Sequence, residues 1–349
     1  MRYLLLVLLL LPWPVAAQHP VEDILAAEAA AGRFSGAALV VQHGRVVARV
    51  NRGRANWQFA VPVTDSTRFP IASMTKTLTA LLVLQLQEQG RLKLTDKAAA
   101  YLPDLPPDCR NVTLLSLLTH YSGLKNEPVN VYTTRLPTAE FVRTYVVRDE
   151  AKPTPVFNYN NVDYILLTRV LEVVSGKSFP VLLQEAILTP LDMKNTGVLT
   201  DSRIVPNLAY GYHNYTFGEG NPKEPLQNDS RELSNYAGAG AVYSTVGDLA
   251  KLVEALQTNR LLRPQTTQRL LTQPQQPDFL DYTRGRPTIG FYYNDRTFPR
   301  PVLERRGSID GFNSLLLTTP DFTTAVIILC NTDTGDLEKI GDAVYGAIK

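Results

Sequence analysis

Apolar residues form short runs of the β type near both ends of the chain. Two such runs within residues 36–50 meet at His43 and Gly44, which have the composition of a tight turn, and together they predict a β-hairpin. Residues 314–318 and 325–330 form a second pair of β-type runs around a turn that contains proline. Strands are therefore expected from both ends of the sequence.

The centre of the chain has helical spacing instead. Residues 78–89, 114–119 and 162–175 carry apolar side chains three or four positions apart, and the first and third segments end before a glycine, which favours a helix C-terminus. Residues 336–349 repeat this spacing after the last β-type run. We expect helices in all four segments.

This order of elements predicts an α+β fold made as one domain from residues 18–349. A sheet would be assembled from residues of about 34–70 and 240–349, and a helical lobe of about 77–239 would be inserted between them. Ligands bind preferentially where two such parts meet. We therefore expect a cleft between the sheet and the helical lobe.

The first 17 residues have the composition of a signal peptide. A basic Arg2 precedes an apolar run, and small residues at Val15 to Ala17 offer a cleavage site. The run is shorter than the ~20 residues that span a membrane, and no cysteine follows to carry a lipid anchor. The sequence predicts an exported protein, periplasmic or secreted, with an uncleaved N-terminal anchor as the alternative.

Composition narrows the possible partners and cofactors. The formal net charge is +2, and the basic residues are scattered along the chain, which speaks against nucleic acid as a partner. Neither the four histidines nor Cys109 and Cys330 have the spacing of a metal site, and no glycine-rich phosphate loop is present, so we expect no metal and no cofactor. The two cysteines could form one disulfide or remain free.

The segment Ser73-Met74-Thr75-Lys76 is the first candidate for chemistry. If a helix begins near Ser73, Lys76 lies one turn later on the same face, within reach of the serine hydroxyl. A serine becomes a nucleophile when a neighbouring base removes its proton, and an amine can do so when its surroundings lower its pKa. A helix-capping serine followed by a solvated lysine is the structural alternative.

Tyr159 and Asn161 are the second candidate pair. They precede the helix expected at residues 162–175, and in an extended or turn segment they would face the same side. A phenol can relay protons and an amide can bind a substrate carbonyl. Without further context, the pair reads equally well as a packing tyrosine with a helix-capping asparagine.

Arg305, Gly307 and Ser308 form the third candidate group, just before a predicted strand. A glycine at a strand edge allows an extended substrate to approach the backbone closely, and Arg305 could hold a substrate carboxylate in a bidentate pair. Solvated arginines at a strand start are the alternative reading for Arg305 and Arg306.

With these three groups in this order, the chain resembles the penicillin-recognising serine hydrolases, in the branch of class C β-lactamases, D-Ala-D-Ala carboxypeptidases and related esterases. The resemblance covers most of the chain after the signal segment. It also includes five connecting stretches, at residues 69–76, 117–124, 157–167, 237–245 and 311–312. It implies a β-lactamase/transpeptidase-like fold, with a mainly antiparallel sheet, helices on both of its faces and a helical lobe.

The resemblance also implies roles for the candidate residues. Ser73 would be the nucleophile, Lys76 its proton acceptor, Tyr159 the general acid and base, and Asn161 a substrate-orienting amide. The backbone N–H groups of Ser73 and Ser308 would form the oxyanion hole. Substrates would be β-lactams, D-Ala-D-Ala peptides of the peptidoglycan type, or small esters.

One departure from the family concerns Arg305 and Arg306. The family usually has Lys or His at the first position and Thr, Ser or Gly at the second, so the departure concerns specificity for a β-lactam or D-Ala-D-Ala and not acyl transfer itself. The sequence leaves three alternatives open: a carboxylesterase, a ligand-binding member without turnover, and a structural or adhesion protein of the envelope.

Overall fold

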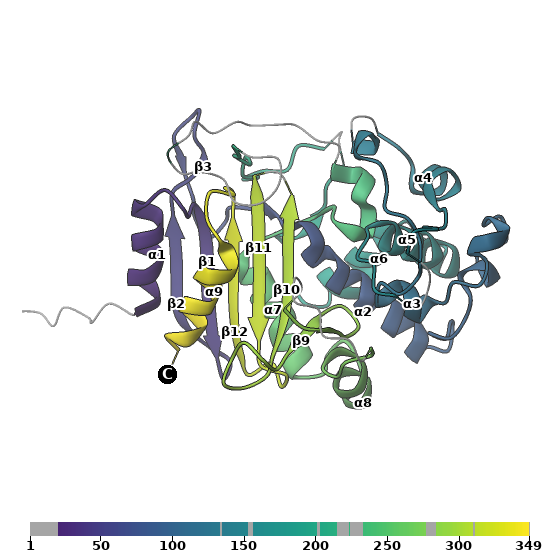
Figure 1. The fold of residues 1–349 in the computed structure, drawn as a ribbon. Coiled ribbons are helices and arrows are strands. Elements are labelled where there is room, and N and C mark those ends of the chain that lie inside the picture. The colour runs from purple at the N-terminus through teal and green to yellow at the C-terminus, as the bar shows by residue number, and fades with distance from the viewer. Residues whose placement is uncertain are drawn as a thin grey trace, which may run out of the picture.

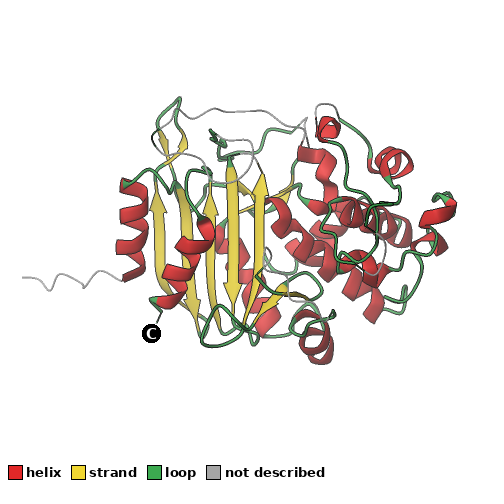
Figure 2. Cartoon of the chain, viewed as in Figure 1, coloured by secondary structure: helices red, strands yellow, loops and turns green. Residues whose placement is uncertain are grey.

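The computed structural model describes residues 20–132, 135–152, 156–200, 203–214, 223, 233–276, 284–309 and 311–348. The proposed signal segment, residues 1–17, lies outside the described residues. Figure 1 shows strands gathered at one side of the molecule and most helices at the other, and Figure 2 separates the two parts by colour. The expected α+β fold is confirmed.

Within the described residues, seven strands form one sheet in which every neighbouring pair is antiparallel. Its order is β2-β1-β12-β11-β10-β9-β8, so strands from the start of the chain pair with strands from its end. The strands are β1 (Gly36–Gln42), β2 (Arg45–Arg52), β8 (Arg286–Pro287), β9 (Tyr292–Asn294), β10 (Val302–Ile309), β11 (Phe312–Thr318) and β12 (Thr324–Cys330).

Both predicted pairs of strands are present. Residues 36–50 form the β1–β2 hairpin, and residues 314–318 and 325–330 lie in β11 and β12. In register, Gly36 lies opposite Cys330, and a Cβ at position 36 would lie 2.0 Å from the carbonyl oxygen of Leu329. Glycine therefore allows β1 to approach β12 closely, which joins the two ends of the chain.

Helices cover both faces of the sheet, as the alternation of buried side chains along the strands requires. The helices α1 (Pro20–Ala30) and α9 (Leu337–Gly346) pack on one face, where Ala38 and Val40 of β1 point. The helix α7 (Val246–Gln257) packs on the other face together with Ala37 and Leu39. This second face continues into the main hydrophobic core of the helical part.

The helical part is built around two long helices, α2 (Thr75–Glu88) and α5 (Val162–Ser175), which contact each other. Shorter segments surround them: α3 (Leu114–Leu118), α4 (Thr138–Tyr145), α6 (Phe179–Leu183) with the π-helical η5 (Gln184–Leu188), and the 3-10 segments η2 (Ala98–Ala100), η3 (Pro107–Cys109), η4 (Val129–Tyr132) and η6 (Leu233–Ala239). The helix α8 (Pro264–Thr266) and the π-helical η7 (Thr267–Leu271) lie below α2 in Figure 1.

Local sequence explains where these helices begin and end. Thr113 and Ser116 form a capping box at the start of α3, and Thr245 caps α7 by accepting a hydrogen bond from the Asp248 N–H. The helix α5 ends at Gly176, whose φ of 72° is left-handed. The predicted limits of α5 are confirmed, whereas α2 begins three residues earlier than the apolar spacing indicates.

Two small sheets are separate from the seven-stranded sheet. The strand β7 (Val242–Ser244) pairs with β5 (Phe69–Pro70) and β6 (Gly197–Val198), and β3 (Arg54–Asn56) pairs with β4 (Val61–Pro62). Because β5 leads directly into the turn before α2, the first small sheet fixes the position from which α2 starts. This turn contains Ser73.

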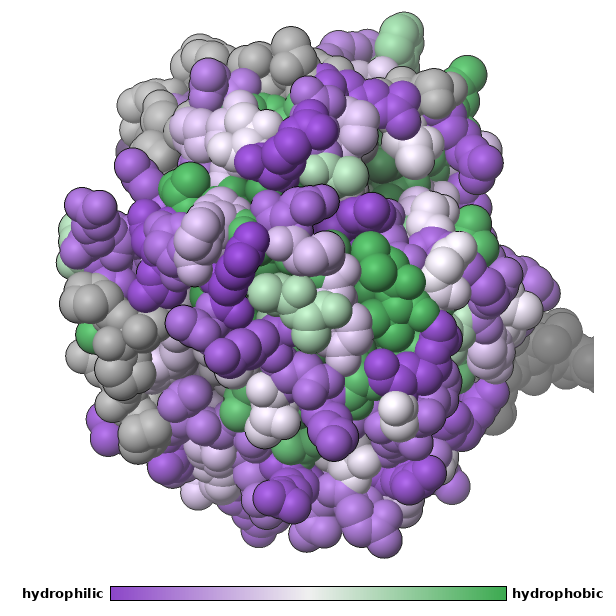
Figure 3. Space-filling view, turned by 90° about the vertical axis from the view of Figure 1, so that its right-hand side faces the viewer, coloured by the Kyte–Doolittle hydropathy of each residue, from purple (hydrophilic) through white to green (hydrophobic). Residues whose placement is uncertain are grey.

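The cysteines Cys109 and Cys330 are both buried and free. Among the described residues, no helix combines the length and apolar character needed to cross a membrane. Figure 3, which views the molecule from its helical end, shows a largely hydrophilic face with scattered hydrophobic patches. The apolar side chains of the helical part are mainly buried around α2 and α5.

Candidate active site

Ser73 lies in a strained turn between β5 and α2. The turn is the 3-10 segment η1 (Ala72–Met74), and Ala72 has a φ of 44°, which is rare for a residue with a Cβ. Ala72 and Met74 are buried, while Ser73 is half-buried. The turn therefore presents the Ser73 side chain at the N-terminal end of α2, where backbone N–H groups favour negative charge.

Lys76 is fully buried in the first turn of α2 and is surrounded by acceptors. Its Nζ lies 3.1 Å from the Oγ of Ser73, 2.8 Å from the Oδ1 of Asn161 and 2.8 Å from the carbonyl oxygen of Ala239 in η6. An ammonium group has three N–H donors, so these contacts use all of them. The alternative of a solvated lysine beside a capping serine is wrong.

Tyr159 approaches Ser73 from the other side. Its phenol O–H donates to the Ser73 Oγ at 2.7 Å, and the Nζ of Lys76 lies 5.0 Å from the centre of its ring. The structure thus brings the three residues together from two helical segments and one loop, with Ser73 between a lysine and a tyrosine. Both neighbours can exchange protons with the serine.

The pKa values of both neighbours of Ser73 are lowered, that of Lys76 mainly by burial and that of Tyr159 by nearby cations. Burial lowers the pKa of Lys76, and the guanidinium of Arg305 lowers it further against the opposite effect of Tyr159. Burial alone would raise the pKa of Tyr159, but the cations of Lys76 and Arg305 outweigh it and lower this pKa to about 8. Both shifts favour the deprotonated form of a proton acceptor beside Ser73.

Asn161 connects this group to a carboxylate that the sequence analysis missed. Its Oδ1 accepts from Lys76, and its Nδ2 donates to the Oε1 of Glu127 at 2.9 Å. Its backbone N–H donates to the Oδ1 of Asn126 at 2.9 Å. Glu127 lies in a segment without regular secondary structure, so no periodicity or motif in the sequence marks it.

Strand β10 closes the site on the side of the sheet. The pairing of β10 with β9 ends at Glu304, so Gly307 and Ser308 are paired on one edge only among the described residues. A Cβ at Gly307 would lie 2.3 Å from the carbonyl oxygen of Ile71 and 2.8 Å from the backbone nitrogen of Ser73. The glycine thus lets β10 run against the turn that carries Ser73, and Ser308 follows as an exposed residue.

Arg305 does not lie on the surface as a solvated side chain. It is 2% exposed, its Nε donates to the backbone carbonyl oxygen of Ser73 at 3.0 Å, and its guanidinium stacks over Tyr292 at 5.6 Å from the ring centre. The alternative reading of two solvated arginines is wrong for this residue. Its predicted contact with a substrate carboxylate stays a prediction.

Arg306 points to the opposite face of the sheet, because successive residues of a strand alternate. Its Nε lies 2.9 Å from the Oε1 of the buried Glu304, and its guanidinium also pairs with Glu338 of α9. The difference from the family at position 306 therefore concerns the packing of α9 and not the surroundings of Ser73.

His120 and Asp163 form a buried pair next to Tyr159. The Nδ1 of His120 lies 2.9 Å from the Oδ2 of Asp163, and its ring packs on the Tyr159 ring with centres 4.5 Å apart. Burial lowers the pKa of His120 well below its ordinary value, and the charges of Lys76 and Arg305 add to this. The pair therefore supports the Tyr159 ring. The sequence analysis had assigned this supporting role to no residue.

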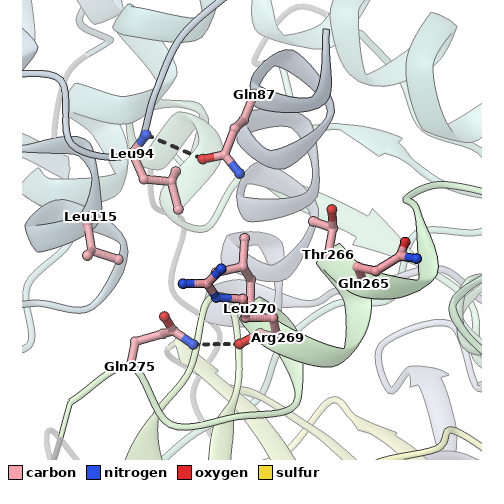
Figure 4. Close-up of a pocket in the computed structure, with 8 residues that line it drawn as sticks. All are labelled: Gln87, Leu94, Leu115, Gln265, Thr266, Arg269, Leu270 and Gln275. Atoms are coloured by element: carbon pink, nitrogen blue, oxygen red, sulfur yellow. Dashed lines mark hydrogen bonds between the residues drawn. The ribbon is translucent and has the colours of Figure 1, made fainter. Parts of the chain in front are cut away.

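The cavity drawn in Figure 4 lies apart from this group. It has a volume of about 410 Å³, and residues of α2, α8 and η7 line it, among them Gln87, Thr266 and Arg269. None of its lining residues belongs to the Ser73 group. Among the described residues, no group of three or more His, Cys, Asp and Glu side chains could hold a metal ion.

The fold and the family follow from comparison with known proteins. The fold is of the β-lactamase/transpeptidase type, with an antiparallel sheet and flanking helices. The model of the family described as "Beta-lactamase" matches residues 21–348. The chain therefore belongs to this family, which confirms the resemblance to the penicillin-recognising serine hydrolases.

Individual relatives are distant. The chain is 26% identical over 320 residues to the teichoic acid D-alanine hydrolase of Staphylococcus aureus, a match that covers 85% of this chain and 78% of the relative. Among solved structures, the D-amino acid amidase of Ochrobactrum anthropi SV3 has a TM-score of 0.82 at 24% identity and covers 94% of this chain and 98% of the other. A penicillin-binding protein of Bacillus halodurans has a TM-score of 0.75 at 24% identity, covering 95% and 98%.

Proposed function

We propose that the protein is a serine hydrolase that cleaves amide or ester bonds through an acyl-enzyme on Ser73. The observation that carries this proposal is the position of the Ser73 Oγ, which lies 3.1 Å from the Lys76 Nζ and 2.7 Å from the Tyr159 hydroxyl. Members of the family are hydrolases, and this arrangement supplies a nucleophile with two proton-transfer groups.

In the proposed acylation step, a deprotonated Lys76 or Tyr159 takes the proton of Ser73. The Oγ then attacks the carbonyl carbon, and the negative charge on the carbonyl oxygen is stabilised by the backbone N–H groups of Ser73 and Ser308. Collapse of this intermediate breaks the bond to the leaving amine or alcohol, which receives its proton through Tyr159. Gly307 supports this arrangement, because its small size keeps β10 against the Ser73 turn.

In the proposed deacylation step, water replaces the leaving group. Tyr159 and Lys76 take a proton from the water as it attacks the acyl carbon, and the Ser73 Oγ recovers a proton when the ester bond breaks. Asn161 would hold Lys76 in place through its Oδ1 and orient the substrate. Residues 1–17 support the further proposal that the protein is exported.

The candidate substrates are β-lactams, peptides that end in D-Ala-D-Ala, and small esters. Hydrolysis of nitrocefin, a D-Ala-D-Ala peptide and p-nitrophenyl acetate by the purified protein tests the proposal and ranks these classes. We expect turnover of at least one substrate, because a single mechanism serves amides and esters. Absence of turnover with all three, together with absence of a covalent adduct, would favour the ligand-binding alternative.

A further inference from the structure

The tip of the hairpin formed by β3 and β4 exposes large apolar side chains. Trp57, Phe59 and Val61 are 49%, 79% and 46% exposed. Figures 1 and 2 show the hairpin projecting beyond one end of the seven-stranded sheet. Single apolar residues scattered over a surface are normal, whereas a contiguous group marks an interaction site. The hairpin tip is therefore a candidate docking surface.

The base of the hairpin is held in place by the rest of the fold. The hydroxyl of Tyr212 accepts a hydrogen bond from the Trp57 backbone N–H at 2.8 Å, and the two rings are in edge contact with their centres 6.2 Å apart. The Nδ2 of Asn331 donates to the carbonyl oxygen of Arg54 at 2.9 Å. Tyr210, itself 48% exposed, donates its backbone N–H to a carbonyl oxygen of β3 at 2.8 Å. The fold thus presents the apolar tip to the outside.

The chain around the hairpin carries positive charge. Residues 29–64 contain five arginines and neither aspartate nor glutamate. Arg49 pairs with Asp65 at 3.0 Å, but Arg52 and Arg54, at the base of the hairpin, form no ion pair with another described residue. Arg54 is exposed and Arg52 is half-buried. Two cations without a carboxylate partner therefore stand behind the apolar tip.

This combination favours a lipid surface over a protein partner. The exposed run covers only residues 57–62, whereas a stable protein interface takes about 20 residues from each side. A bilayer needs only a few residues, because aromatic and aliphatic side chains lie at the boundary between headgroups and acyl chains while arginines beside them reach the headgroups. Anionic headgroups add electrostatic attraction for the two arginines. An anionic bilayer matches both features of the hairpin.

We propose that the β3–β4 hairpin docks the protein on the surface of an anionic phospholipid bilayer. Trp57, Phe59 and Val61 enter the boundary between headgroups and acyl chains, and Arg52 and Arg54 contact lipid phosphates. This docking is a second function of the chain, and it does not depend on the proposed acyl-enzyme.

Vesicle binding by residues 18–349 tests this assignment. This chain keeps every residue that the structure describes, lacks the apolar run of residues 1–17, and has Trp57 as its only tryptophan. Vesicles of equal parts phosphatidylglycerol and phosphatidylcholine are expected to sediment the protein and to shift the emission of Trp57 to shorter wavelength. Vesicles of phosphatidylcholine alone should bind it about tenfold more weakly, because the two arginines then lose the attraction of an anionic surface.

Phe59→Ser is expected to weaken binding to the anionic vesicles about tenfold, since it removes the most apolar contact of the tip. Val181→Ser, at a 45% exposed position of α6, is the matched control and should bind as the parent does. Both variants should hydrolyse p-nitrophenyl acetate at the rate of the parent, because neither position belongs to the Ser73 group.

The assignment is overturned if the parent does not bind the anionic vesicles, or if Phe59→Ser binds them as tightly as the parent. It is also overturned if the protein sediments with the vesicles while the emission of Trp57 stays unchanged. A dimer in solution that Phe59→Ser dissociates, in the absence of vesicle binding, would assign the hairpin tip to a second copy of the chain instead.

Discussion

Replacing Lys76 by methionine is expected to lower kcat/KM about a thousandfold, the contribution of a well-placed general base. Methionine fills a similar volume in the fully buried position but cannot accept a proton from Ser73. The protein should remain folded because methionine fills the volume, but with a lower unfolding temperature, since the acceptors on Asn161 and Ala239 lose their donor at about 1–3 kcal/mol each. Initial rates with p-nitrophenyl acetate, together with the thermal unfolding temperature, measure both effects.

Lys177→Met is the matched control, because Lys177 is exposed and pairs with Glu185 at the surface. It should keep the kcat/KM of the parent. If Lys76→Met retained most of the activity while remaining folded, the assignment of Lys76 as a proton-transfer group would be wrong, and Tyr159 alone would have to activate Ser73.

Replacing Arg305 by glutamine is expected to move the rising limb of the pH–rate profile to higher pH. The reaction needs a deprotonated base, so the rate rises as pH passes the pKa of the Lys76 and Tyr159 pair, and the pKa of Tyr159 is about 8. The Arg305 cation lowers the pKa of both groups, so its removal raises both. A shift of one to two pH units would lower the rate near neutral pH by roughly 10- to 100-fold.

Arg305→Lys keeps the positive charge and should keep the rising limb close to that of the parent. The profile of kcat/KM against pH, measured for the parent and both variants, separates an electrostatic role from a structural one. If Arg305→Gln lowered the rate equally at every pH, the cation would not tune the base, and its contact with the Ser73 carbonyl would account for the effect instead.

The fold was predictable wherever a periodic pattern and a terminal signal agree. The helix α5 has both a continuous apolar face and Gly176 at its end, so its limits follow from sequence. The start of α2 does not follow, because no side chain caps it and the 3-10 turn at Ser73 runs into it directly. The strands β8 and β9 are only two and three residues long, too short to show alternation.

The contact between Ser73 and Lys76 was predictable, because the two residues are three positions apart and one helical turn brings them together. The role of Arg305 was harder to predict, because sequence does not show which face of β10 packs against the Ser73 turn. Glu127 and Asp163 could not be found in this way, since each is placed beside its partner by tertiary packing: Glu127 beside Asn161, and Asp163 beside His120.

Covalent labelling tests the central claim most directly. The parent, Ser73→Ala and Ser178→Ala are incubated with a fluorescent penicillin and with a p-nitrophenyl ester, and the intact mass and the modified peptide are determined. Ser178 is exposed and makes no cap bond in α6, so it is a neutral control. We predict an acyl adduct on Ser73 in the parent and in Ser178→Ala, and none in Ser73→Ala. An adduct that persists in Ser73→Ala, or that maps to another residue, would contradict the acyl-enzyme at Ser73.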